Sequence, residues 1–163
     1  MNKHKQYKLE KTMLSYDKYI KGELFEKARA IIVKNDQVVF IKNLSNGKIT
    51  IPGGGVDEGE SVEEAVIREA FEETGIKVNP VCKVGENFYD VDMTLGDIKF
   101  VSKRVEYIYV CEYVDQIADI HGIEGEYAGK TEIYFDKPSK LVDCFVTKES
   151  LDKVLDYIKE KQC

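Results

Sequence analysis

The sequence has no tryptophan, three prolines and two histidines among 163 residues. Its four cysteines include no Cys-x-x-Cys pair, so the chain lacks the spacing of Cys and His that binds zinc. We therefore expect no zinc centre and four free thiols. Cys111 and Cys144 lie in β-type stretches and are expected to be core residues.

Long apolar runs are also missing. No stretch approaches the roughly 20 apolar residues that cross a bilayer, and the Lys-rich residues 2–11 lack the apolar segment of a signal peptide. The formal net charge of −6 disfavours a general nucleic-acid binder, whose surface is basic. The sequence therefore predicts a cytoplasmic protein without a membrane or nucleic-acid partner. Its length fits one domain over residues 1–163.

The most informative segment is residues 54–76, GGVDEGESVEEAVIREAFEETGI. Within it, Ser61 and Glu64 form the S-x-x-E pattern of a capping box, which predicts that a helix begins there. Gly75 predicts its end, because glycine readily takes the left-handed conformation just beyond a helix. We therefore expect one helix between Ser61 and Gly75.

The apolar stripe on one side of this helix continues with acidic residues. The stripe has helical spacing and contains, in order, Val62, Ala65, Val66, Glu69, Glu72 and Glu73. Like charges at this spacing repel by roughly 0.2–0.5 kcal/mol per pair even when exposed, and burial increases the cost. A solvated acidic face is the alternative interpretation, but the position on the stripe favours a bound divalent cation. Ligands that are all oxygen atoms favour Mg²⁺ or Mn²⁺.

Two further features adjoin the acidic stripe. Arg68 lies four residues before Glu72, so it is predicted to orient a carboxylate, the alternative being a solvent-facing side chain. The glycines at 53–55 follow a β-type segment, are expected to form a loop, and let the backbone approach a ligand or a metal. A simple glycine turn would be the better interpretation if this run stood alone.

Together these residues match a known motif. The segment resembles the Nudix box at every defining position: Gly54, Glu60, Arg68, Glu69, Glu72, Glu73, Gly75 and Ile76. The resemblance implies an α/β fold, a Nudix-like α/β/α sandwich with a mixed β-sheet. It also implies a Mg²⁺- or Mn²⁺-dependent hydrolase that cleaves a phosphoanhydride bond in a nucleoside triphosphate or in a nucleoside diphosphate linked to another moiety.

The resemblance also implies residue roles. Glu69, Glu72 and Glu73 would bind the metal, with the Gly53 carbonyl as a further ligand, and Arg68 would belong to the catalytic group. Gly54 and Glu60 would support them. Within the box, Glu69 is the first candidate for the general base.

Some Nudix enzymes take the base from a later loop instead. The late carboxylates of this chain are Glu112, Glu124, Glu126 and Glu132. Among them Glu126 is the first choice, because it lies in a Gly-rich segment.

Other functions stay open at this point. A nucleotide-binding regulator of Nudix fold without catalysis is the main alternative, although the intact box disfavours it. The acidic balance argues against a capped-RNA substrate, and the absence of Cys/His metal spacing argues against an isoprenoid diphosphate isomerase. The expected partner is a small nucleotide-type substrate, with the choice between a nucleoside triphosphate and a nucleotide sugar open.

Hydrophobic patterns complete the prediction. They indicate strands at 27–34, 37–42, 48–51, 78–89, 98–114 and 141–146, a turn at 35–36, and a helix at 148–161. Residues 115–140 are expected to form a variable loop over the site. The first 24 residues are open to interpretation as a lid, a dimer arm or an additional helix, so a homodimer is one assembly to consider.

Overall fold

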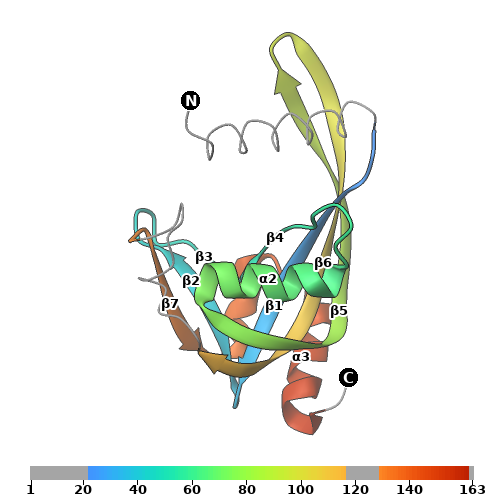
Figure 1. Cartoon of the computed structure of the whole chain (residues 1–163). Coiled ribbons are helices and arrows are strands. Elements are labelled where there is room, and N and C mark those ends of the chain that lie inside the picture. Colours follow the sequence, from blue (N-terminus) through green and yellow to red (C-terminus); the bar gives the residue numbers. More distant parts are fainter. Residues whose placement is uncertain (1–21, 117–128, 162–163) are drawn as a thin grey trace. The chain divides into compact units, whose positions relative to one another are not determined.

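A computed structural model of the chain describes residues 22–116 and 129–161. Its elements, in chain order, are β1 (Phe25–Lys34), β2 (Gln37–Asn43), β3 (Ile49–Thr50), β4 (Gly53–Gly55), α2 (Val62–Thr74), β5 (Ile76–Leu95), β6 (Ile98–Gln116), β7 (Thr131–Asp136), the 3₁₀ helix η2 (Pro138–Cys144) and α3 (Lys148–Glu160) (Figure 1).

The chain divides into two compact units. The larger unit comprises Lys27–Glu86 and Tyr107–Cys163, and it contains every residue of the box. The smaller unit comprises Met1–Glu26 and Asn87–Glu106. Among its described residues, the ends of β5 and β6 form a hairpin that turns at Gly96, whose φ of 59° suits glycine. The Arg104 guanidinium lies 5.5 Å from the centre of the Phe25 ring.

The sheet has the order β3-β2-β1-β6-β5, with β4 paired to β1 and β7 paired to β2. Strands β1 and β2 are antiparallel and pair through Val33 with Val38, next to the turn at Asn35. Farther from this turn, β1 pairs with β4 and β2 pairs with β3. Strands β3 and β4, which are consecutive in sequence, therefore lie beside the end of the β1–β2 hairpin that is far from its turn.

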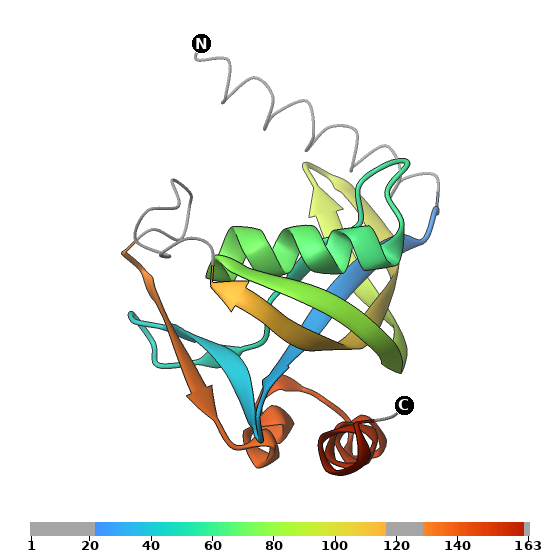
Figure 2. The same ribbon diagram turned by 60° about the horizontal axis from the view of Figure 1, so that its bottom comes forward.

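Two hydrophobic cores lie on opposite faces of this sheet, with α2 on one side and α3 on the other (Figure 2). The core under α2 contains Ala28, Ala30, Ile32, Val39, Ala65, Val66, Ala70, Ile76, Val78 and Cys111. The core under α3 and η2 contains Ile31, Phe40, Ile108, Val110, Leu141 and Val154, among others. Successive residues of β1 alternate between the two cores, as a sheet covered on both faces requires. The predicted α/β/α sandwich is confirmed.

The capping interactions of α2 match the sequence pattern. The Ser61 hydroxyl accepts from the Glu64 amide at 3.1 Å, and the Glu64 carboxylate accepts from the Ser61 amide at 2.8 Å. Gly75 closes the helix with φ 70°. The predicted C-terminal helix is also present as α3, capped by the Thr147 hydroxyl.

Three secondary-structure predictions were wrong. The glycine run is not a loop, because Gly53–Gly55 pair with Lys27–Arg29 as β4. The predicted strand at 141–146 is the 3₁₀ helix η2, which begins at Pro138 and buries only Leu141. Conversely, β7 lies within the predicted loop 115–140 and gains its strand conformation by pairing along β2.

The cysteines also depart from expectation. Cys111 and Cys144 are free, and Cys111 is buried in the core as predicted. Cys82 is disulfide-bonded, so the expectation of four free thiols was wrong. Spacing along the chain does not show which cysteines meet in space. Across residues 22–116 and 129–161, none of the helices has the length and apolarity needed to span a membrane.

Candidate active site

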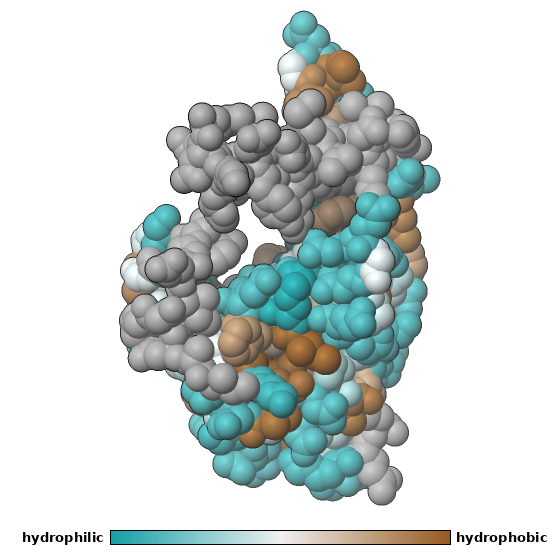
Figure 3. Space-filling view, in the orientation of Figure 1, coloured by the Kyte–Doolittle hydropathy of each residue, from teal (hydrophilic) through white to brown (hydrophobic). Residues whose placement is uncertain are grey.

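The acidic side of α2 holds carboxylates in different environments. The Glu69 side chain is only 13 % exposed, whereas that of Glu72 is 56 % exposed. Glu73 lines a cavity beside β4. The surface over α2 is largely hydrophilic (Figure 3). Two of the three carboxylates therefore face inward, while the exposed side of α2 carries Ile67 and Phe71 as well as glutamates.

Arg68 connects this acidic side to the preceding loop. Its guanidinium forms a two-pronged pair with Glu60, with Nε 2.7 Å from Oε1 and Nη2 2.9 Å from Oε2. Nη1 donates to Glu69 Oε1 at 2.7 Å, and Nη2 also donates to the Gly55 carbonyl at 2.9 Å. The hydrogen bond with Glu60 raises the pKa of Arg68 despite its partial burial. Arg68 thus fixes Glu69 relative to the loop.

The glycine strand approaches the carboxylates directly. The Gly53 amide donates to Glu73 Oε2 at 3.1 Å. A Cβ on Gly54 would lie 2.7 Å from Glu69 Oε2 and 2.5 Å from its carboxyl carbon. A side chain at position 54 would therefore displace the Glu69 carboxylate, so glycine here allows a close approach rather than a special φ.

Gly54→Ala is expected to lower catalytic turnover by about 100-fold, because the added methyl group must displace the Glu69 carboxylate from its position beside Arg68. The hydrolysis rate at saturating metal is the measurement. Gly47→Ala is not a suitable control, because Gly47 has φ 71°. An exposed helical change, Lys153→Ala, serves instead. Parent-like turnover of Gly54→Ala would show that Glu69 tolerates displacement.

Burial shifts the ionisation of two of these carboxylates. It raises the pKa of Glu73 to about 7, although the hydrogen bond from the Gly53 amide acts in the opposite direction. Burial also raises the pKa of Glu69, against the effect of Arg68. Ionising Glu69 and Glu73 is therefore energetically unfavourable in the metal-free protein. This is expected of carboxylates whose negative charge is stabilised by a bound cation.

The metal-free protein is expected to lose stability as pH rises from about 5 to 8. The folded pKa of Glu73 is about 7 against an ordinary 4.5, so the folded state holds this proton more tightly. The bound proton on Glu73 therefore stabilises the folded state fully below the unfolded-state pKa, and this stabilisation is lost as pH rises through the folded-state pKa. The expected decrease in the free energy of unfolding is on the order of 2–3 kcal/mol. Melting curves in chelator, for the parent and Glu73→Gln, measure it. Identical pH dependence in both proteins would exclude Glu73 as the source.

The donor set suits a hard divalent cation. Glu69, Glu72 and Glu73 supply carboxylate oxygens from one helix, and the adjoining glycine strand supplies backbone carbonyls. Within the described part of the chain, no three His, Cys, Asp or Glu side chains are already grouped as a metal cage. Arg68 instead contacts both Glu69 and, at 3.4 Å, Glu72. The buried carboxylates of Glu69 and Glu73 therefore fit a hard cation by their chemistry, whereas Glu72 is exposed in this arrangement.

A cavity of about 470 Å³ adjoins Glu73, Gly53 and Gly54. Lys27 and Arg29 line it from β1. On the other side it is lined by Ile41, Asn43, Asn46, Lys48, Ile49, Thr50 and Thr131. The site thus consists of an acidic helix and an adjoining cavity that contains three basic side chains.

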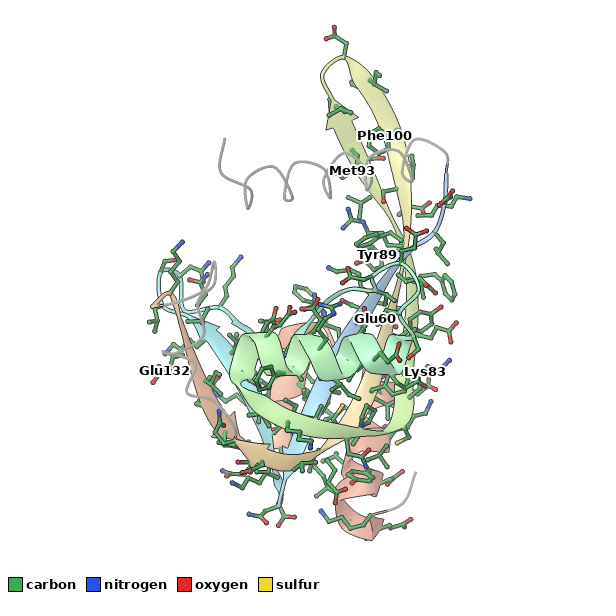
Figure 4. The ribbon with its side chains drawn as sticks, in the orientation of Figure 1. Glu60, Lys83, Tyr89, Met93, Phe100 and Glu132 are labelled. Atoms are coloured by element: carbon green, nitrogen blue, oxygen red, sulfur yellow. The ribbon has the colours of Figure 1, made fainter. Side chains whose placement is uncertain are left out.

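The late carboxylates that the structure describes are not among the lining residues of this cavity. Glu132 lines an adjoining hollow of about 760 Å³ with Tyr134, and the two spaces share Lys48 and Ile49. Because Tyr134 packs against the α3 core and Ile133 against the α2 core, alternation places Glu132 on the α3 face. Figure 4 shows Glu132 on β7, well separated from Glu60 beside α2. Glu112 also interacts electrostatically with Tyr157 of α3.

Neither Glu112 nor Glu132 lines the cavity beside Glu73. The remaining two, Glu124 and the first choice Glu126, lie outside the described residues.

The sequence did not identify the basic residues of the cavity. Lys27 and Arg29 occupy alternate positions at the start of β1, which places both side chains on one face. This alternation could have indicated from the sequence that the two basic side chains lie together. Nothing in the sequence, however, indicated that Lys48 from the β2–β3 connection would line the same cavity.

Comparison with known proteins is consistent with this site. Residues 24–133 match the profile of the NUDIX domain. The chain is 49 % identical over 49 residues to an ADP-ribose pyrophosphatase of Methanocaldococcus jannaschii, covering 28 % of this chain and 29 % of that protein. It is 38 % identical over 64 residues to a putative 8-oxo-dGTP diphosphatase of Bacillus subtilis, covering 38 % and 43 %. The matches thus span less than half the length of either relative.

A solved structure extends the likeness across the fold. The crystal structure of an ADP-ribose pyrophosphatase from Streptococcus suis aligns with a TM-score of 0.56 at 16 % identity, covering 85 % of this chain and 92 % of that one. At this identity the likeness concerns the fold alone. The profile match covers about two thirds of the chain and includes the whole box. By this match and the site's geometry, the chain belongs to the Nudix family.

Proposed function

We propose that this protein is a metal-dependent hydrolase of phosphoanhydride bonds. Its substrate would be a nucleoside triphosphate or a nucleoside diphosphate linked to another moiety. The observation that carries the proposal is the pair of inward-facing carboxylates, Glu69 and Glu73, which are held by Arg68 and by β4 beside a basic cavity. Such an arrangement can hold a cation and an anionic substrate next to each other.

Glu69, Glu72, Glu73 and the Gly53 carbonyl would hold Mg²⁺ or Mn²⁺. When bound, the cation supplies neutralisation of phosphate charge and a lower pKa for a water molecule. Glu69 is the proposed general base. Burial raises its pKa, and Arg68 offsets part of that rise, which favours the ionised form that accepts a proton. Arg68 and Glu60 act as positioning residues, since they orient Glu69 without reaching the cavity.

The substrate class is open at this level. One relative is named for ADP-ribose, a nucleoside diphosphate joined to a sugar, and the other for 8-oxo-dGTP, a nucleoside triphosphate. Both contain the bond that we propose this chain cleaves. A cytoplasmic location and a homodimer remain predictions.

The test is phosphate-product release from a panel of nucleoside triphosphates, nucleotide sugars, ADP-ribose, NADH and dinucleoside polyphosphates. Each substrate is assayed with Mg²⁺, with Mn²⁺ and with chelator, and the melting temperature is recorded with and without metal. Metal-dependent cleavage together with a metal-raised melting temperature supports the proposal. Nucleotide binding without cleavage of any substrate would favour a regulator and overturn it.

A further inference from the structure

The cavity beside Glu73 has basic side chains on two walls. Lys27 and Arg29 extend from one face of β1, and Lys48 lies just before β3 across the cavity. Glu73 is the one carboxylate among the described lining residues. Three positive charges therefore adjoin one negative charge, before any metal binds the acidic side of α2.

Two asparagines add hydrogen-bond donors. The Asn43 side-chain oxygen accepts from the Ser45 amide at 2.8 Å and from the Ser45 hydroxyl at 2.6 Å. The Asn46 side-chain oxygen accepts from the Lys48 amide at 2.9 Å. Because a backbone amide only donates, these contacts fix the oxygen of each carboxamide toward the backbone. What each asparagine then presents to a ligand is its NH₂ group, a donor.

The described lining therefore combines three cationic side chains and two carboxamide donors with few side-chain acceptors, namely Glu73 and the hydroxyls of Thr50 and Thr131, and it contains no aromatic ring. A nucleobase is normally held by stacking and by a mixture of donors and acceptors, and sugar hydroxyls need acceptors as well. Phosphate oxygens only accept, and they carry negative charge. Among the parts of a nucleotide, a phosphate group is the one that this cavity matches in both hydrogen bonding and charge.

We infer that this cavity receives a phosphate group next to the diphosphate at the acidic helix, so that the preferred substrates carry three or more phosphates in a row. This inference rests on the proposed function and narrows its substrate class. A diphosphate joined to a sugar would place hydroxyl groups among the donors of Lys27, Lys48 and Asn43. A nucleoside triphosphate would place anionic oxygens there.

The first measurement compares substrates matched by base: ATP with ADP-ribose, and UTP with UDP-glucose, at equal free Mg²⁺. For the better base, kcat/KM for the triphosphate should exceed that for the diphosphate sugar by at least about ten-fold. The second measurement needs no turnover. Calorimetry should show that inorganic tripolyphosphate binds at least about ten-fold more tightly than pyrophosphate.

Variants of the lining residues test whether the preference for three phosphates arises from the cavity. Lys27→Gln and Lys48→Gln should each weaken tripolyphosphate binding and raise KM for the triphosphate by about ten-fold, and should raise KM for a diphosphate sugar by a smaller factor, because its hydroxyl groups carry no charge. Lys42→Gln is the matched control. Lys42 lies on β2 and lines the hollow with Glu132 but not the cavity beside Glu73, so the same loss of charge there should leave tripolyphosphate binding and the KM for the triphosphate within about two-fold of the parent.

Faster cleavage of the diphosphate sugars, or equal weakening by all three variants, would overturn the inference while leaving the proposed hydrolase intact. A protein that cleaves none of these substrates would contradict the proposed function. In that case, tight tripolyphosphate binding that depends on Lys27 and Lys48 would still support the cavity assignment, and its absence would overturn that assignment as well.

Discussion

Replacing Glu73 with glutamine is expected to lower metal-dependent turnover by about 100-fold or more while the fold stays intact. Glutamine keeps the shape of the side chain, and its oxygen can still accept from the Gly53 amide, which lies 3.1 Å from Oε2 in the parent. What it lacks is the negative charge that stabilises a divalent cation. The measurement is kcat at saturating Mg²⁺, with circular dichroism to check the fold.

The matched control is Glu58→Gln. Glu58 lies in the same box, but its side chain is exposed, so removing its charge should change kcat by less than about two-fold. Turnover of Glu73→Gln within a few-fold of the parent would contradict the site assignment. Because Glu73→Gln replaces a costly buried charge with a neutral amide, this variant should also melt above the parent at pH 8 in chelator.

Replacing Arg68 with glutamine is expected to destabilise the protein by about 2–4 kcal/mol, which corresponds to roughly 5–10 °C in melting temperature. The side chains of Arg68, Glu60 and Glu69 are 25 %, 15 % and 13 % exposed. Without the guanidinium, two poorly solvated carboxylates lose their cation and the Gly55 carbonyl loses a donor, although Glu60 keeps the hydrogen bond from the Asp57 amide. Urea denaturation measures the effect, and turnover should also fall because Glu69 is no longer oriented.

Two comparisons separate this mechanism from a general loss of charge. Lys83→Gln removes a surface pair with Glu86, in which the side chains are 44 % and 39 % exposed, and should leave the urea midpoint close to that of the parent because solvent screens such a pair. The double variant Arg68→Gln with Glu60→Gln should lose less stability than the sum of the two single variants, because it also removes the Glu60 charge that has lost its cation. Strict additivity would mean that Arg68 and Glu60 do not depend on each other.

Sequence patterns predicted the elements whose determinants are local. The bounds of α2 follow from the Ser61–Glu64 capping box and from Gly75, which act within one turn of the helix. The helix α3 and the strands β1 and β2 follow from periodic apolar positions. The acidic stripe was visible for the same reason, since three carboxylates at helical spacing share one side of a helix wherever that helix packs.

Tertiary pairing decided the elements that the sequence misassigned. The glycine run looks like a loop because glycine has little strand preference, yet β1 supplies its hydrogen-bonding partners. Residues 131–136 look like part of an acidic loop, yet β2 pairs with all six of them. In both segments, the strand conformation comes from a neighbour that is distant in sequence.

The sequence by itself determined the family, the helix that carries the carboxylates and the kind of cation that they suit. Only the tertiary structure decided which carboxylates are buried, that Gly54 packs against Glu69, and that Lys27 and Lys48 line one cavity with Glu73. Capping and helical spacing act over a few residues and are therefore readable along the chain. Burial and charge complementarity arise between β1, β3, β4 and α2, and they exist only after these elements have packed together.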